Sequence, residues 1–169
     1  MTREKNLPLI HETRTYFTFA ELHQDIAQAV FPDIRHTSFH EATDDEDHDD
    51  DCDDEYSTYV MGKFRCTNKA CETSAWSSKM VTILIRRYPG NGYSALVYNQ
   101  RCKACDQLGT FRLHKQSYVE RIAYRLKKWG GVATAPQVFG EKTGPPHEQE
   151  FCEGCKRGIC RQTSNFGFY

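Results

Sequence analysis

The spacing of apolar residues along the amino-terminal part of the chain predicts a helix. Four large apolar residues recur there at near-helical spacing: Phe19, Leu22, Ile26 and Val30. Thr18 and Glu21 are spaced as in a capping box, in which the two side chains satisfy free backbone N–H groups at a helix start. Pro32 ends the pattern, because proline cannot continue a helix. We therefore expect an amphipathic helix at about residues 18–30.

From Tyr59 onward the pattern changes to that of strands, with β-branched and aromatic residues between short polar turns. The sequence Pro-Gly-Asn-Gly at 89–92 has the composition of a tight turn, so the segments on either side of it form a hairpin. The far end of this hairpin leads into Cys102 and Cys105. The predicted strands are 59–66, 76–88, 93–101 and 110–113.

Helical spacing returns once more after the strands. Ser117 and Glu120 form a second capping-box pattern, and Gly130-Gly131 marks the end of the segment. Its apolar stripe consists of Tyr118, Ile122, Leu126 and Trp129. The fold class predicted from these elements is α+β, with a small antiparallel sheet and flanking helices.

Charge divides the chain into two unlike parts. The 169 residues have a formal net charge of −1. Residues 1–55 contain 4 Lys/Arg and 16 Asp/Glu, a net of −12, whereas residues 56–169 contain 18 and 7, a net of +11. Ten of the twelve residues at 44–55 are acidic, and like charges at that density favour a solvated, disordered segment. The alternative is that this run folds back over the basic part and competes there with nucleic acid.

We therefore divide the chain into four parts. They are an amino-terminal segment with the amphipathic helix at 1–40, an acidic disordered linker at 41–57, a zinc-binding domain at 58–162 and a tail at 163–169. No apolar run approaches the roughly 20 residues that a membrane-spanning helix needs. The first residues also lack the pattern of a secretory signal. We expect a cytoplasmic or nuclear protein without an integral membrane segment, in which cysteines stay reduced.

The cysteines carry the strongest chemical signal. Seven of the eight fall into three clusters, and only Cys52, inside the acidic run, is left over. With one nearby histidine they give eight ligands, enough for two tetrahedral zinc ions. Two short cysteine turns separated by a long hairpin have the arrangement of a zinc ribbon. We expect them to form the first site, which consists of Cys66, Cys71, Cys102 and Cys105.

The second predicted zinc site lies within fourteen residues near the end of the chain. Its expected ligands are His147, Cys152, Cys155 and Cys160. An interleaved arrangement, in which His147 completes the first site, remains an alternative. Both sites are filled by protein ligands and leave no position for a catalytic water, so we expect structural zinc and no enzyme. A zinc deaminase would need a glutamate where the chain has Gln149.

These clusters resemble the 3CxxC-type zinc-finger family over about residues 59–160. The specific marks are Trp76-Ser-Ser78, the segment Tyr98-Asn-Gln-Arg-Cys102, and the spacing of Cys152, Cys155 and Cys160. The first pair, with four residues between Cys66 and Cys71, is similar to a fungal-type variant of the family. The resemblance implies zinc binding. It connects the chain with receptor-transporting proteins, which assist receptor trafficking, and with zygote-arrest proteins, which bind messenger RNA.

The basic part of the chain suggests nucleic-acid binding, with single-stranded RNA favoured. Arginine and lysine side chains contact phosphates, and aromatic side chains stack on bases. The aromatic candidates are Tyr88, Tyr93, Tyr98 and Phe111. The predicted phosphate contacts are Arg86, Arg87, Arg101, Lys103, Arg112, Arg121, Arg125 and Lys128. The simpler interpretation is a solvated basic surface over core aromatics.

A protein-interaction module is the alternative function. The amphipathic amino-terminal helix and the acidic run favour an adaptor or trafficking chaperone that binds a protein partner. The sequence alone does not choose between RNA and protein as the partner.

Overall fold

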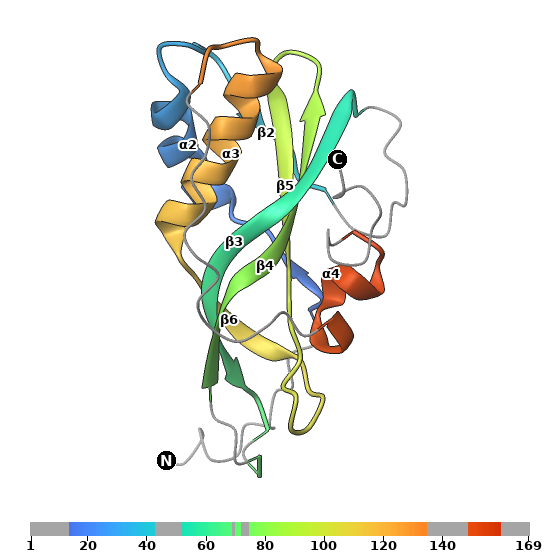
Figure 1. Cartoon of the computed structure of the whole chain (residues 1–169). Helices are drawn as coiled ribbons and strands as arrows, with labels where there is room; N and C mark the ends of the chain where they lie inside the picture. Colours follow the sequence, from blue (N-terminus) through green and yellow to red (C-terminus); the bar gives the residue numbers. More distant parts are fainter. Residues whose placement is uncertain (1–13, 43–51, 69, 72–74, 135–148, 160–169) are drawn as a thin grey trace.

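A computed structural model describes residues 14–42, 52–68, 70–71, 75–134 and 149–159. Within these residues the chain forms one twisted six-stranded sheet, mostly antiparallel (Figure 1). The strand order is β1-β5-β4-β3-β6, and β2 pairs with β5 in parallel. The strands are β1 (Tyr16–Phe17), β2 (Ser38–Phe39), β3 (Asp54–Cys66), β4 (Ala75–Tyr88), β5 (Gly92–Tyr98) and β6 (Gly109–Leu113).

Helices lie on both faces of the sheet (Figure 1). The larger pair, α2 (His23–Val30) and α3 (Lys115–Trp129), pack together on one face. The short helix α4 (Glu153–Lys156) lies on the other face, where the Thr82 side chain packs closely against Gly154. Two 3₁₀ turns, η1 (Ala20–Leu22) and η2 (Gln149–Phe151), precede α2 and α4. These elements confirm the α+β class.

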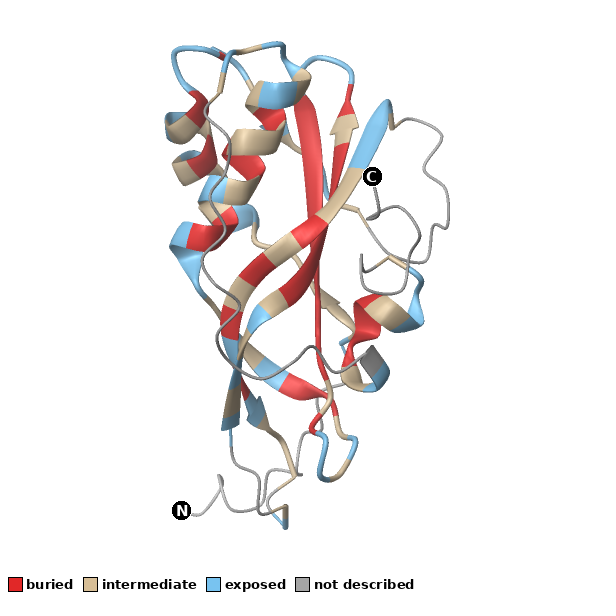
Figure 2. Cartoon of the chain, viewed as in Figure 1, coloured by how far each residue is buried: buried red, intermediate tan, exposed pale blue. Residues whose placement is uncertain are grey.

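The main core lies between the sheet and the α2–α3 pair. Alternate residues of β4, Val81, Ile83 and Ile85, point toward the helices and are fully buried. Ile26 of α2 and Ile122 of α3 meet them from the other side, also without solvent exposure. Figure 2 shows this as continuous red along β5 and as red in the second half of β4. We call this region, formed by residues 54–60, 81–88 and β5, the helix-covered sheet.

The other end of the sheet has a different construction. A register irregularity between Val60 and Gly62 separates it from the helix-covered sheet. Beyond this point three strands continue, and we call residues 62–66, 75–78 and β6 the cysteine-end sheet. On one of its faces the Phe64 ring is stacked on Trp76 with centroids 5.2 Å apart and contacts Phe111 at 4.7 Å. On the opposite face the side chains alternate with these rings and are exposed.

The predicted hairpin is confirmed. β4 pairs with β5 in antiparallel register around a turn in which Gly90 and Asn91 have positive φ values of 79° and 63°. The strand before it begins earlier than predicted, inside the acidic run. Glu55 lies opposite Arg86 in the sheet, and their side chains form an ion pair of 3.2 Å. The expected disordered linker therefore does not extend through 54–57, while the acidic residues 43–51 lie outside the described part of the chain.

Both helices form where predicted, but neither begins with the predicted capping box. The Thr18 hydroxyl donates to Glu41 Oε1 at 3.4 Å, and no side chain caps η1 or α2. Helix α3 begins two residues early, and His114 Nδ1 accepts from the backbone N–H of Ser117. The Ser117 hydroxyl instead accepts from the backbone N–H of Met61 at 3.0 Å. In both cases a tertiary contact takes the hydroxyl that the local pattern assigned to a cap.

Candidate metal centre

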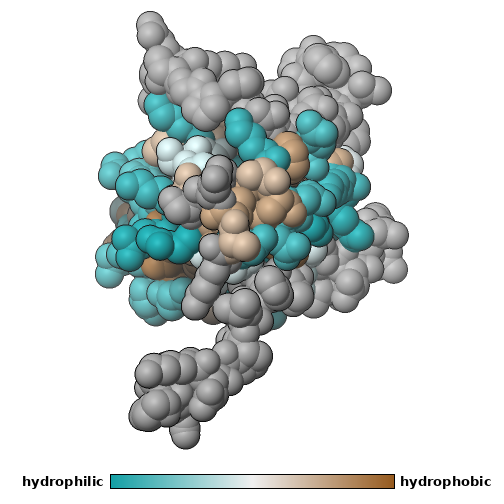
Figure 3. Space-filling view, turned by 90° about the horizontal axis from the view of Figure 1, so that it is seen from below, coloured by the Kyte–Doolittle hydropathy of each residue, from teal (hydrophilic) through white to brown (hydrophobic). Residues whose placement is uncertain are grey.

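The four cysteines of the first predicted site are brought together at one end of the sheet. Cys66 is the last residue of β3, and Cys71 lies in the connection from β3 to β4. Cys102 and Cys105 lie in the connection from β5 to β6. A metal ion bound by all four would therefore join two loops whose ends belong to four different strands. This end of the molecule, seen in Figure 3, presents an apolar patch surrounded by hydrophilic groups.

The sulfur positions fit a tetrahedral metal site. All four Sγ atoms lie within 4.8 Å of one another. The Cys66–Cys105 and Cys71–Cys102 sulfur pairs are 3.5 and 3.6 Å apart. Zinc–thiolate bonds of about 2.3 Å place tetrahedral sulfurs about 3.8 Å apart, close to these separations. The chain therefore provides a four-thiolate zinc site, and a zinc ion held there would have no open coordination position.

Backbone hydrogen bonds hold the two loops in this geometry. In the first loop the N–H of Asn68 donates to Cys66 Sγ at 3.4 Å, and the N–H of Cys71 donates to the carbonyl of Asn68 at 3.0 Å. In the second loop the N–H of Asp106 donates to the carbonyl of Cys102 at 2.7 Å. The positive φ of 62° at Asp106 turns the chain back toward β6. These contacts hold the cysteines of both loops in positions that a common ligand could share.

Proton chemistry in the cluster opposes full ionisation. Burial and hydrogen bonding with the other thiols raise the pKa of Cys66 to about 12. Burial also opposes ionisation of Cys105, but the backbone of Gln107 and the neighbouring thiols lower its pKa to about 7. Because zinc binds thiolates, zinc binding at neutral pH must release protons from this cluster, including the proton of Cys66.

The second predicted site is only partly within the described residues. Cys152 is 1% exposed and caps α4, with its sulfur accepting from the backbone N–H of Cys155 at 3.4 Å. This is the tight turn expected of a Cys-x-x-Cys pair. His147 and Cys160 lie outside the described residues. The structure therefore brings one four-cysteine site together, and a second cysteine pair, Cys152 and Cys155, lies at the start of α4.

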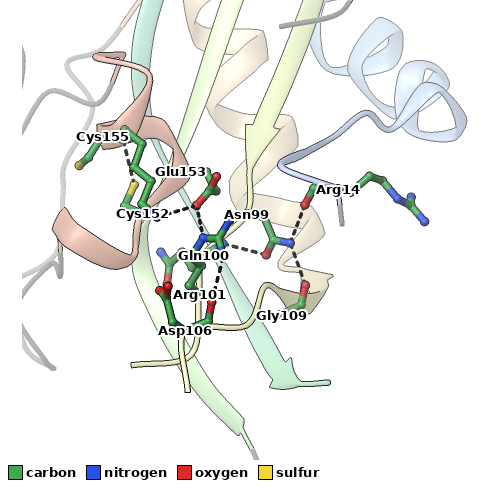
Figure 4. A network of polar contacts seen from close by, with 10 residues as sticks. Arg14, Asn99, Gln100, Arg101, Asp106, Gly109, Cys152, Glu153 and Cys155 are labelled. Carbon is green, nitrogen blue, oxygen red and sulfur yellow. Dashed lines mark hydrogen bonds and ion pairs between the residues drawn. The ribbon is translucent and has the colours of Figure 1, made fainter. Parts of the chain in front are cut away.

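A polar network joins the Cys102–Cys105 turn to the Cys152–Cys155 turn (Figure 4). At its centre is Asn99, whose side chain is fully buried. Its side-chain amide donates to the carbonyls of Arg14 and Gly109 at 2.9 and 2.8 Å, and its backbone carbonyl accepts from the N–H of Glu153. Arg101 extends the network, because its Nε donates to Glu153 Oε2 at 2.8 Å. Sequence reasoning identified this segment as a family mark but assigned it no role.

Several of the predicted phosphate contacts are engaged within the fold. Arg86 is 4% exposed and paired with Glu55, so burial removes it from the surface. Arg121 donates through Nε to the carbonyl of Tyr59 at 3.0 Å, and the guanidinium of Arg125 lies 3.5 Å from the centroid of the Tyr56 ring. Arg87 and Arg101 are partly buried, whereas the exposed members of the set are Lys103, Arg112 and Lys128.

Three of the four predicted stacking residues are buried, and the fourth, Phe111, is partly buried. Tyr88, Tyr93 and Tyr98 are 5%, 0% and 1% exposed. Tyr93 Oη is 2.9 Å from His23 Nδ1, and burial raises the pKa of this tyrosine above its usual range. Phe111 packs against Phe64, in the row of aromatic rings that Phe64, Trp76 and Phe111 form on one face of the cysteine-end sheet. Burial of the three tyrosines corrects the prediction that they stack on bases and agrees with the simpler interpretation of core aromatics.

A basic surface forms around the predicted residue Arg112, together with two residues that sequence reasoning missed. Lys63 lies directly opposite Arg112 in the β3–β6 register, and Arg65 follows two residues later, so all three side chains are on one face. All three are exposed. We call them the basic triad. Their signal in the sequence is the alternation of Lys63, Phe64 and Arg65, which is typical of a strand with one buried and one solvated face.

Four cysteine sulfurs converging from two loops at the end of an antiparallel sheet define a zinc-binding protein of the zinc-ribbon class. A family model for the 3CxxC zinc ribbon, a zinc-binding domain, matches residues 59–158. Since the match covers more than half of the chain, the protein belongs to this family. No curated protein and no solved structure matches the chain. Among the described residues, every helix is too short or too polar to cross a membrane.

Proposed function

We propose that the protein is a non-enzymatic, zinc-stabilised RNA-binding protein, and that it binds phosphate groups through the basic triad. The observation that carries this proposal is the pairing of Lys63 with Arg112. Like charges placed directly opposite each other in a sheet are destabilising unless an anion lies between them. A phosphodiester backbone supplies such anions at regular intervals.

The surroundings of the triad support an anionic ligand. The three strand segments of the cysteine-end sheet contain no aspartate or glutamate, so no carboxylate of these segments neutralises the triad. Lys79, at the adjacent strand irregularity, is also exposed. By contrast, lysines of α3 lie near carboxylates of the α2 region, with Lys115 3.5 Å from Asp25 and Lys127 3.6 Å from Asp33. The triad is therefore the better phosphate site.

RNA is the first ligand to test because the resemblance to zygote-arrest proteins favours it over DNA. The face that carries the triad presents no stacked aromatic row, since the rings of Phe64, Trp76 and Phe111 occupy the opposite face. Binding through phosphates alone is independent of base sequence. We therefore expect broad affinity for RNA, with a steep dependence on salt.

The test measures fluorescence anisotropy of a labelled single-stranded RNA pool with the zinc-loaded chain. The variant K63Q/R65Q/R112Q removes three cations from the triad. Each phosphate contact on a single strand contributes about 0.7 to the slope of log K against log salt, so we expect the slope to fall by about 2. The matched control R35Q/K115Q/K128Q removes the same charge from exposed positions elsewhere and should keep both affinity and slope.

Two outcomes contradict the proposal. One is an equal loss of RNA affinity in both triple variants, which would mean that affinity depends on the net charge of the protein and not on the basic triad. The other is no binding of RNA, single-stranded DNA or duplex at low salt, in which case the protein-interaction alternative takes its place.

We also propose a second zinc ion, bound by His147, Cys152, Cys155 and Cys160. The support is the Cys152–Cys155 turn on α4, which has the amide-to-sulfur hydrogen bond typical of a metal-binding knuckle. Metal analysis should find two zinc ions per wild-type chain and about one in C102S or C155S, since each substitution disables one site. One zinc ion in the wild type and one in C155S would overturn the second site.

A further inference from the structure

Glu153 is a charged, nearly buried residue that links the Cys152–Cys155 turn to the Cys102–Cys105 turn. Its side chain is only 7% exposed. A carboxylate so far from water needs charged partners, and it has two: Arg101 Nε at 2.8 Å and Lys156 Nζ at 3.6 Å. The Arg101 contact is the shorter one and is itself largely shielded, whereas the Lys156 side chain is 42% exposed. The Arg101–Glu153 pair is therefore the stronger link.

Arg101 also supports the second cysteine loop of the metal site. Its Nη1 donates to the carbonyl of Asp106 at 2.9 Å, and Asp106 directly follows Cys105. The backbone of Arg101 donates to the carbonyl of Phe151, just before Cys152. One arginine thus contacts the turn that ends in Cys105 and the turn that begins at Cys152 (Figure 4).

Asn99 forms a second connection between the same parts. Its carbonyl accepts from the N–H of Glu153 at 3.1 Å, which fixes the first turn of α4. Its side-chain amide donates to the carbonyl of Gly109, the residue opposite Cys66 in the β3–β6 register. Hydrogen bonds with buried or half-buried members therefore connect both cysteine loops with α4.

We propose that Arg101 and Glu153 are positioning residues of the four-cysteine metal site, and that metal binding at this site is energetically coupled to the folding of α4. Metal fixes the Cys102–Cys105 loop, which fixes Arg101, which in turn holds Glu153. Coupling of this kind is reciprocal, so an ordered α4 also raises the affinity of the four cysteines for metal. Groups that orient metal ligands from outside change metal affinity by about 10–100-fold when they are substituted.

The test uses the full chain carrying C155S, so that the second cysteine pair does not contribute metal binding of its own. Co²⁺ is titrated against the remaining site and followed by the absorption of tetrahedral thiolate coordination. We expect R101Q and E153Q each to weaken Co²⁺ binding at least tenfold. The control K156Q removes the exposed partner of the same carboxylate and should change the affinity less than twofold.

Hydrogen exchange in the same background measures the coupling directly. Addition of one equivalent of Zn²⁺ should slow exchange of the α4 amides at least tenfold, and E153Q should abolish most of this slowing. R101K keeps the positive charge beside Glu153. A lysine lacks the second N–H donor of the guanidinium group that reaches the carbonyl of Asp106, so the metal affinity of R101K should lie between those of wild type and R101Q. The amides of β5 report in each variant whether the rest of the chain is folded.

Two results would overturn the coupling. The first is α4 exchange that does not respond to metal in the C155S chain. The second is a fall in melting temperature that is the same with and without metal in R101Q or E153Q, because a purely structural role would destabilise both states equally.

Discussion

The helix-covered sheet and the cysteine-end sheet are continuous along β3 and β4 but are stabilised differently. The first buries fully apolar side chains such as Val81, Ile83 and Ile122 under two helices. The second has a single row of aromatic rings, an exposed basic face and a four-cysteine site at its tip. Figure 2 shows the contrast as red ribbon giving way to tan and blue. Phe64 continues the same hydrophobic core into the cysteine end, and we expect this end to depend on bound metal more than the helix-covered sheet does.

The largest expected effect comes from removing the metal. Structural zinc contributes about 10–16 kcal/mol to the folding of small zinc domains. Chelation should therefore release the cysteine-end sheet, with amides of β6 exchanging at least about 100-fold faster, while β5 amides such as that of Val97 remain protected. Hydrogen exchange with mass spectrometry, before and after chelation, makes the comparison. Uniform loss of protection across both regions would show that they unfold as one unit.

The second effect concerns the helix-covered sheet alone. Ile122 is fully buried in the main core, so I122A should lower the free energy of unfolding by about 2–5 kcal/mol. Urea denaturation of the zinc-loaded chain measures this loss, and saturating zinc should not restore it. The exposed Lys128 on the same helix is the control, and K128A should stay within about 0.5 kcal/mol of wild type. If added zinc restored the stability that I122A loses, the two regions would not be stabilised independently.

The third effect is pH dependence of the cysteine end. Because the pKa of Cys66 is raised to about 12, its proton is present in the metal-free cluster at neutral pH and leaves when zinc binds. Zinc affinity therefore rises with pH and falls as the pH is lowered, by about tenfold per pH unit for each proton released. Titration with a zinc indicator between pH 7.5 and 5.5 measures the change. An affinity independent of pH would contradict thiolate binding, and protection of β5 amides should persist throughout.

The smallest effect tests the start of α2. The Thr18 hydroxyl contacts an exposed glutamate and caps no helix, so T18A should change stability by less than about 0.5 kcal/mol. A capping threonine would instead contribute about 1 kcal/mol. Thermal unfolding of the zinc-loaded chain distinguishes the two values. A loss near the larger value would mean that Thr18 does cap the first turn.

Local patterns predicted most of the elements and the four-cysteine site. Strand alternation, the Pro-Gly-Asn-Gly turn and the helical stripe of α3 depend on neighbours in sequence, and each was confirmed. The grouping of the cysteines followed from ligand number and from the hairpin between them. Features that depend on distant partners were not predictable. Composition alone placed Glu55 in a linker, yet its partner Arg86 is thirty-one residues away and draws it into the sheet.

The basic surface shows the same limit. A helical wheel places Arg121 and Arg125 opposite the apolar stripe, where solvent is expected, but the edge of β3 covers that side. Lys63 and Arg65 gave a visible signal in their alternation with Phe64. Their significance depends on Arg112, which only the strand pairing places beside Lys63. Predicting which strand becomes the neighbour requires long-range contacts that periodicity does not contain.

The bonds of Asn99 also have a consequence for how the chain is made. Its backbone N–H reaches Thr15, near the beginning of the described chain, and its carbonyl reaches Glu153, near the end. During synthesis on the ribosome, β1 and β5 emerge well before α4, so this carbonyl has no partner until the last described helix appears. Until α4 forms, this carbonyl can bond only to water. The sheet is therefore completed at this point only late in translation.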